Sequence, residues 1–189
     1  LRSHWTGWRL TLATAVSYYG VQTFMAQLET AYFGPALGIP AEWVPHFFIT
    51  SLPIVLIFIP LAVWALGKMR SSQGDDPAAQ RLALPLPQWA WKLAVIAALY
   101  VALYFSFGIF VAWQNPALVA MYGNGSNTVI FNNAILVPFQ FLRGILWTLF
   151  ALPVIRSSKG SAWQIGLLIG LLLAIPTNIS HLIPNPIMP

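Results

Sequence analysis

The sequence predicts an all-α fold: a polytopic transmembrane helix bundle with five spans, forming one domain over residues 1–189. The first observation is composition, because 58% of the residues are hydrophobic and 7% are charged. Soluble domains carry about 25% charged residues, so this chain has too few to cover a water-facing surface. The other two observations are five long apolar stretches and an alternation of basic and non-basic connections, which together indicate a bilayer as the solvent.

Each predicted span is long enough to cross a hydrocarbon layer of about 30 Å, which takes about 20 helical residues. The five spans are residues 8–33, 44–66, 90–113, 129–155 and 162–182. Backbone groups in lipid must form their hydrogen bonds within the segment, so each span is expected to be a helix. Residues 67–88 are polar and contain Pro and Gly, which predicts a linker between the second and third spans.

The basic residues predict the orientation of the bundle. Apart from Arg143, every Lys and Arg lies near a span end on one side: Arg2, Arg9, Lys68, Arg70, Arg81, Lys92, Arg156 and Lys159. The alternate connections, residues 34–43 and 114–128, contain neither Lys nor Arg. By the positive-inside rule, the N-terminus and the 67–88 linker are expected in the cytoplasm and the C-terminus outside.

The location expected from this pattern is a plasma or inner membrane, with the chain crossing it several times. The net charge of +5 is explained by loops held in the cytoplasm beside anionic lipid, so nucleic acid is not an expected partner. The chain starts without Met, and its Pro-rich end leaves open a sixth helix in a longer native chain.

Glu29 is the one acidic residue inside a predicted span. Tyr18, Gln22 and Glu29 follow one another at intervals of four and seven residues, so they share one helix face. A polar stripe on a spanning helix is expected to point into the bundle and away from lipid. Glu29 could bind a solute or a proton there, join helices by hydrogen bonds, or reach the headgroups about one turn away.

Arg143 lies near the middle of the fourth span, where Asn133, Gln140 and Arg143 share a face. Placing an arginine at that depth costs about 2.5–3.5 kcal/mol on insertion scales, so exposure to lipid is disfavoured. The guanidinium is expected to find an anion, backbone carbonyls or water. The sequence leaves open whether that partner is structural or a substrate.

Glu29 is the obvious partner for Arg143, but the predicted depths do not match. Counted from the outer ends of their spans, the two residues differ in depth by about 15 Å at 1.5 Å per residue. A direct pair therefore needs a helix tilt or a vertical shift, and the alternative is a relay through Gln22, Gln140 or water. The predicted site for a substrate or proton consists of Tyr18, Gln22, Glu29, Asn133, Gln140 and Arg143.

A metal site is not predicted, although His46, His181 and Glu29 fall on the same predicted side. Two His and one carboxylate suit zinc or iron, but these residues come from three different spans and show no ligand spacing. The chain has no cysteine, which excludes thiolate ligands and thiol nucleophiles. No cofactor and no catalytic residue is indicated by a motif.

Gly166 and Gly170 form a GxxxG motif in an apolar stretch. Small residues at this spacing let helices pack closely, so the motif indicates a contact within the chain, with a second copy, or with another membrane subunit. The motif is short and therefore weak evidence on its own.

The sequence is compatible with three functions. The first is binding or translocation of a small solute or proton at Glu29 and Arg143. The second is a non-catalytic accessory or assembly subunit, in which the same residues are structural. The third is a membrane enzyme that acts at the outer face on a lipid or lipid-linked substrate through Glu29, His46 and His181. An enzyme is the least favoured of the three, because no activating spacing is visible.

Overall fold

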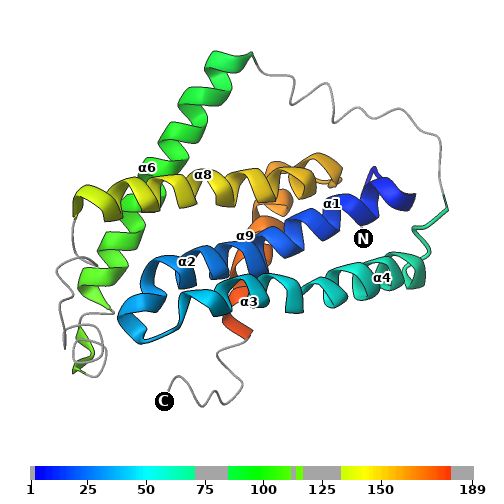
Figure 1. Ribbon diagram of the computed structural model, residues 1–189. Coiled ribbons are helices and arrows are strands. Elements are labelled where there is room, and N and C mark those ends of the chain that lie inside the picture. Colours follow the sequence, from blue (N-terminus) through cyan, green and yellow to red (C-terminus); the bar gives the residue numbers. More distant parts are fainter. Residues whose placement is uncertain (1–2, 71–84, 112–113, 117–132, 180–189) are drawn as a thin grey trace. The chain divides into compact units, whose positions relative to one another are not determined.

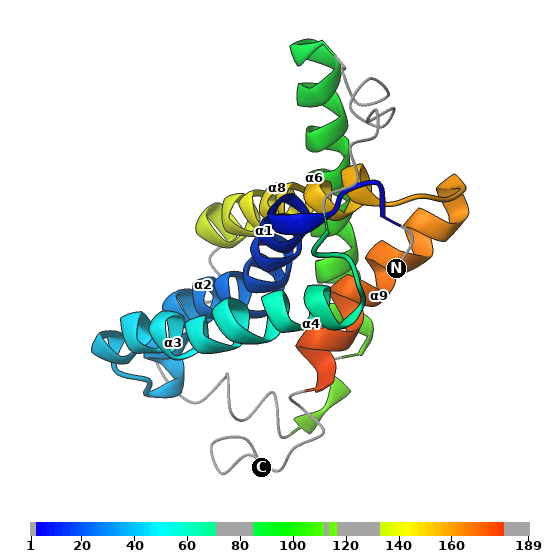
Figure 2. The same cartoon turned by 90° about the vertical axis from the view of Figure 1, so that its right-hand side faces the viewer.

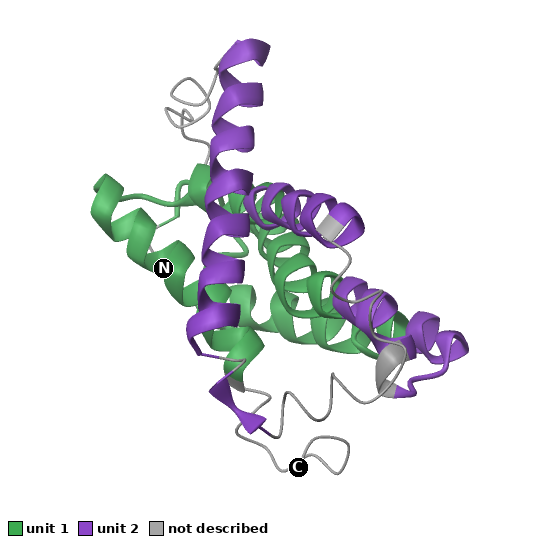
Figure 3. Cartoon of the chain, turned by 90° about the vertical axis from the view of Figure 1, so that its left-hand side faces the viewer, with its two compact units in different colours: residues 1–26, 47–83, 149–189 green, residues 27–46, 84–148 purple. Residues whose placement is uncertain are grey.

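The computed structural model describes residues 3–70, 85–111, 114–116 and 133–179 (Figure 1). Within these residues the chain forms five helices and no strand, so the fold is all-α. Two of the helices are interrupted by a wider turn, and the described residues divide into two compact units (Figure 3).

The first helix runs from α1 (Gly7–Tyr19) through a π-helical turn (Gly20–Phe24) into α2 (Met25–Phe33). The second begins after a short 3-10 turn (Ala41–Trp43) and runs from α3 (Val44–Thr50) through a π-helical turn (Ile54–Phe58) into α4 (Ile59–Ala65). The remaining three are continuous: α6 (Leu86–Phe110), α8 (Asn133–Ser157) and α9 (Ala162–Ile179).

The irregular turn in the second helix has a cause in the sequence. Pro53 directly precedes the π-helical turn and Pro60 follows it. Each proline lacks a backbone N–H and its ring crowds the preceding turn, so the regular hydrogen-bond ladder cannot continue past it. A widened turn lets the helix run on between the two prolines.

Three of the described helices are long and apolar enough to cross a membrane: Ala41–Ala65, Leu86–Phe110 and Ala134–Ser157. A further apolar helix, Ala162–Asn178, is shorter. The first helix, from Gly7 to Phe33, is not among these, which fits its content of polar residues. The number of spans and their direction stay predictions.

The surface of α6 supports a membrane environment. Ala97 is the one fully buried residue of this 25-residue helix. Large apolar side chains such as Leu99, Phe107 and Phe110 are exposed along it. Water would penalise this area by about 25 cal/mol for each Å² of apolar surface, whereas acyl chains cover it without that cost.

Unit 1 comprises residues 1–26, 47–83 and 149–189. In it α1 and α4 run side by side, and Leu10 packs against Ile59 and Val63 to form its core (Figure 1, Figure 2). Farther along, the ring of Phe150 lies where a Cβ on Gly20 would stand, so the π-helical turn accommodates this ring because residue 20 has no side chain.

Backbone hydrogen bonds join three segment ends within unit 1. The Gly7 N–H donates to the Lys68 carbonyl at 2.7 Å, and the His4 N–H donates to the Ser157 carbonyl at 2.7 Å. The start of α1, the end of α4 and the end of α8 therefore meet. Each of these ends carries a basic residue, Arg9, Lys68 or Arg156, which is the arrangement that the positive-inside pattern requires.

Unit 2 comprises residues 27–46 and 84–148. Its apolar core is Phe33 and Leu136, with three partly buried rings packed against them: Tyr32, Phe105 and Phe139. The backbones of α6 and α8 approach closely, because a Cβ added to Gly144 would lie 2.8 Å from the Cα of Ala97. Small residues at a helix contact permit such an approach.

We expect Gly144→Ala to destabilise the protein, because its new methyl group would meet the backbone of α6. Overpacking of this kind costs about 1–3 kcal/mol of unfolding free energy. Gly170→Ala is the matched control, since a Cβ at Gly170 has no neighbour within 4 Å and alanine favours helix by about 0.5–1 kcal/mol. Thermal unfolding of the purified variants measures both effects, and equal stability of the two would contradict the close contact.

The predicted sidedness is open to direct labelling, because the chain contains no cysteine. Ala41→Cys and Ser161→Cys each place one thiol at an exposed position, before α3 and before α9 respectively. In intact cells a membrane-impermeant thiol reagent should modify Ala41→Cys, and it should reach Ser161→Cys after the membrane is opened. Labelling of both thiols from the outside would disprove the predicted orientation.

Candidate functional site

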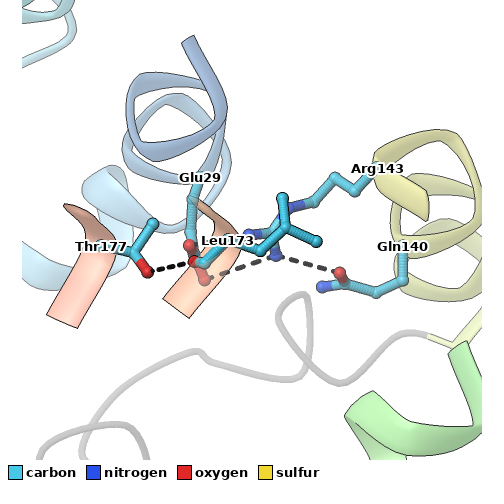
Figure 4. Close-up of polar contacts among 5 residues, drawn as sticks. All are labelled: Glu29, Gln140, Arg143, Leu173 and Thr177. Carbon is cyan, nitrogen blue, oxygen red and sulfur yellow. Dashed lines mark hydrogen bonds and ion pairs between the residues drawn. The ribbon is translucent and has the colours of Figure 1, made fainter. Parts of the chain in front are cut away.

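Glu29 on α2 and Arg143 on α8 form a direct ion pair within unit 2 (Figure 4). Arg143 Nη2 donates to Glu29 Oε2 at 2.9 Å, and Nη1 lies 3.4 Å from Oε1. This two-point contact matches the planar guanidinium to the planar carboxylate, a geometry that lysine cannot reproduce. Of the two possibilities that the sequence left open, a direct pair or a relay, the structure has the direct pair.

The nominal offset of about 15 Å expected from the sequence does not keep Glu29 and Arg143 apart, because their side chains are in direct contact. The long arginine side chain takes up part of this offset, and the two charges meet without a relay residue between them.

Gln140 completes the arrangement, and we call Glu29, Gln140 and Arg143 the ion-pair cluster. Gln140 precedes Arg143 by three residues on α8, so the two side chains are neighbours on one face. Arg143 Nη1 donates to Gln140 Oε1 at 3.0 Å. The guanidinium is thus bound by a charged acceptor from another helix and a neutral acceptor from its own.

The two ends of the ion pair differ in burial. The side chain of Arg143 is 5% exposed and that of Glu29 is 45% exposed. Gln140 is fully buried. The cation is therefore held inside the unit, while part of the carboxylate faces outward. A buried guanidinium depends strongly on its partner, because a lone charge in a low-dielectric interior is costly.

Some polar atoms of this cluster have no hydrogen-bond partner in the part of the chain that the structure describes. They are Arg143 Nε and Gln140 Nε2. Both are donors, and both belong to groups that are already joined through Nη1 and Oε1. Each buried donor without an acceptor lowers the stability of the fold by about 1–3 kcal/mol. The cluster could therefore form further hydrogen bonds with an added acceptor.

Aromatic rings border the guanidinium. Its Cζ lies 5.8 Å from the ring centre of Phe139 and 6.0 Å from that of Tyr100. Tyr32 stacks on Phe139 with a centroid separation of 4.2 Å and an interplanar angle of 13°. These rings add a weak cation–π attraction at the limit of its range and reduce the access of water.

The ion-pair cluster does not include the other predicted site residues. Tyr18 and Gln22 belong to unit 1, where Tyr18 packs against the apolar core of Leu10, Ile59 and Val63. Asn133 is the first residue of α8, and its side chain lies outside the described residues. The residues brought together are therefore Glu29, Gln140 and Arg143.

The histidines show no metal-binding arrangement among the described residues, where no three His, Cys, Asp or Glu side chains gather. His46 is exposed, and its Nδ1 donates to the Glu42 carbonyl at 2.9 Å, since a carbonyl can only accept. His181 lies outside the described residues. The outer-face enzyme accordingly stays a prediction from sequence.

Sequence reasoning missed the rings around the guanidinium. Phe139 precedes Arg143 by four residues and Tyr32 follows Glu29 by three, so helical spacing alone could have placed each beside its charge. Tyr100 comes from α6, and no local pattern relates it to Arg143. It lies beside Gly144 because the small Ala97 and Gly144 let α6 and α8 approach.

Comparisons with protein-family models, with curated proteins and with solved structures each found no match. The features of this chain that bear on function are the geometry of the ion-pair cluster and the surroundings of its atoms.

We expect Glu29→Gln to lower the unfolding free energy by about 3 kcal/mol, the lower end of the range for breaking a buried pair. The half-exposed carboxylate keeps the effect from being larger. In the double variant Glu29→Gln/Arg143→Gln no charge is left unpaired, so its loss should be smaller than the sum of the single losses. Glu42→Gln, at an exposed acid of the same unit, should leave stability unchanged.

This cycle is measured by chemical or thermal unfolding in one detergent at one pH. Strict additivity of the two single changes would contradict an energetic coupling between Glu29 and Arg143.

Proposed function

We propose that this chain is a multi-pass membrane protein that binds a small polar solute at the ion-pair cluster. The observation that carries the proposal is the pair of unpaired donors, Arg143 Nε and Gln140 Nε2, on buried side chains. Translocation of the solute across the membrane would be a natural use of such a site, because Gln140 and Arg143 lie on a helix that is long and apolar enough to span it.

A purely structural role accounts for the ion pair but not for the remaining donors. Each donor left without an acceptor costs about 1–3 kcal/mol, and an apolar residue in place of Gln140 would avoid part of that cost. A bound solute or water would supply the missing acceptors. The ion pair then has a second task, which is to hold the guanidinium in a fixed orientation toward the solute.

A solute is favoured over a proton as the bound species. Protonating Glu29 would neutralise the carboxylate that is bound to Arg143 through two contacts. The buried guanidinium would then have no counter-charge, and its acceptors would be neutral oxygens of Glu29 and Gln140. Binding a solute beside the intact pair avoids this loss.

The accessory-subunit function is the second candidate, and a specific observation favours it. Gly166 and Gly170 on α9 have open space around them, so this face can accept another helix. The direct ion pair would then serve to fix the bundle. The two candidates differ in whether solutes in water can reach Gln140.

Cysteine accessibility separates the two candidates in this cysteine-free chain. Gln140 and Leu136 are both buried, at 0% and 3% exposed, so their exposure alone predicts no difference between thiols at the two positions. Solute binding predicts that Gln140→Cys, in lipid vesicles, reacts with a small water-soluble thiol reagent. Leu136→Cys is the matched control, because Leu136 lies one turn earlier on α8 and belongs to the apolar core of unit 2. It should react much more slowly.

Equal inertness of the two thiols in folded protein, with full reaction after denaturation, would contradict solute binding and favour the accessory subunit. Circular dichroism of each variant checks that α-helix content is retained before the rates are compared.

A further inference from the structure

We propose that the solute is a small zwitterion of the α-amino acid class, whose carboxylate binds Arg143 and Gln140 and whose ammonium binds Glu29. This inference rests on the proposed function and names the chemical class of its ligand. It follows from three features of the ion-pair cluster: its net charge, the type of its unpaired atoms, and the outward part of the Glu29 carboxylate.

The charge of the cluster selects against simple ions. The formal charges of Glu29 and Arg143 cancel, and they are separated by 2.9 Å at the closest atoms. Adding an anion or a cation would leave one uncompensated charge in a low-dielectric environment, which is costly. A zwitterion has both charges and adds none in total, so it can lie antiparallel to the ion pair.

The unpaired donors determine where the carboxylate end binds. Arg143 Nε and Gln140 Nε2 can each donate a hydrogen bond, and neither can accept one in its present state. A carboxylate has two oxygens with about four acceptor sites, so it can accept a hydrogen bond from either donor. Either bond would be charge-assisted, because the carboxylate is ionised, and such a bond is about twice as strong as a neutral one.

The Glu29 carboxylate determines where the ammonium end binds. Two of its acceptor sites face Arg143, and the side chain is still 45% exposed. An ammonium has three donors and no acceptor, so it complements the remaining carboxylate sites. The nearby rings of Tyr32 and Tyr100 carry hydroxyl groups and add no formal charge to the cluster.

The intact protein in lipid nanodiscs can be titrated by calorimetry with each standard L-amino acid. The best ligand is then compared with two truncated analogues, the acid without its amine and the amine without its carboxylate. We expect the amino acid to bind at least about tenfold more tightly than either analogue, because each analogue lacks one charge-assisted contact.

Two variants test the assignment of the ligand ends. Gln140→Leu keeps both contacts between Glu29 and Arg143, and it removes one donor to the ligand carboxylate together with the Oε1 acceptor of Arg143. It should weaken amino-acid binding by about tenfold. Glu29→Gln removes the ammonium partner and frees the guanidinium, so it should reverse the preference and bind the deaminated acid more tightly than the amino acid. Glu42→Gln should behave as the parent protein.

A reversal of ligand preference is a readout that general destabilisation of the fold cannot produce. Binding of the acid or the amine as tightly as the amino acid would overturn the zwitterion and leave solute binding in place. Absence of heat with every probe, together with an inert thiol in Gln140→Cys, would overturn solute binding as well. Heat that persists unchanged in both cluster variants would place the ligand elsewhere and overturn the inference.

Discussion

The two-point contact between Glu29 and Arg143 is the interaction on which the polar part of this fold depends. An arginine in the middle of an apolar helix is tolerated when a counter-charge meets it, and here that counter-charge comes from a helix more than a hundred residues away in sequence. The pair fixes how α2 faces α8 within unit 2. Helical spacing along α8 places Gln140 and Phe139 beside the guanidinium, and the facing of the two helices brings Tyr32 onto Phe139.

The apolar part of the fold obeys a different constraint. A helix such as α6, with Ala97 as its one fully buried residue, gains little from contacts within the described chain. Its exposed apolar side chains need acyl chains or another protein to cover them. The few inward contacts are made by small residues, because association in lipid depends on close packing and on polar contacts between helices.

The helical segments and the shared face of Gln140 and Arg143 could be predicted from the sequence, because both depend on local spacing and hydropathy. The direct pair could not, since the spacing of residues along each helix does not determine how far one helix is shifted or tilted against the other. The position of Tyr100 depends on the approach of α6 to α8 at Ala97 and Gly144. A tertiary contact of this kind leaves no periodic pattern in either helix.

The backbone approach at Gly144 has a mechanical consequence. Gly144 is the residue next to Arg143, and on α6 both Ala97 and Tyr100 lie against it. Because Gly144 has no side chain, the backbone of α8 lies close to α6 at the residue that follows Arg143. A rotation of α6 would therefore displace the backbone of α8 next to Arg143. A displacement of the α8 backbone at Arg143 would in turn move α6.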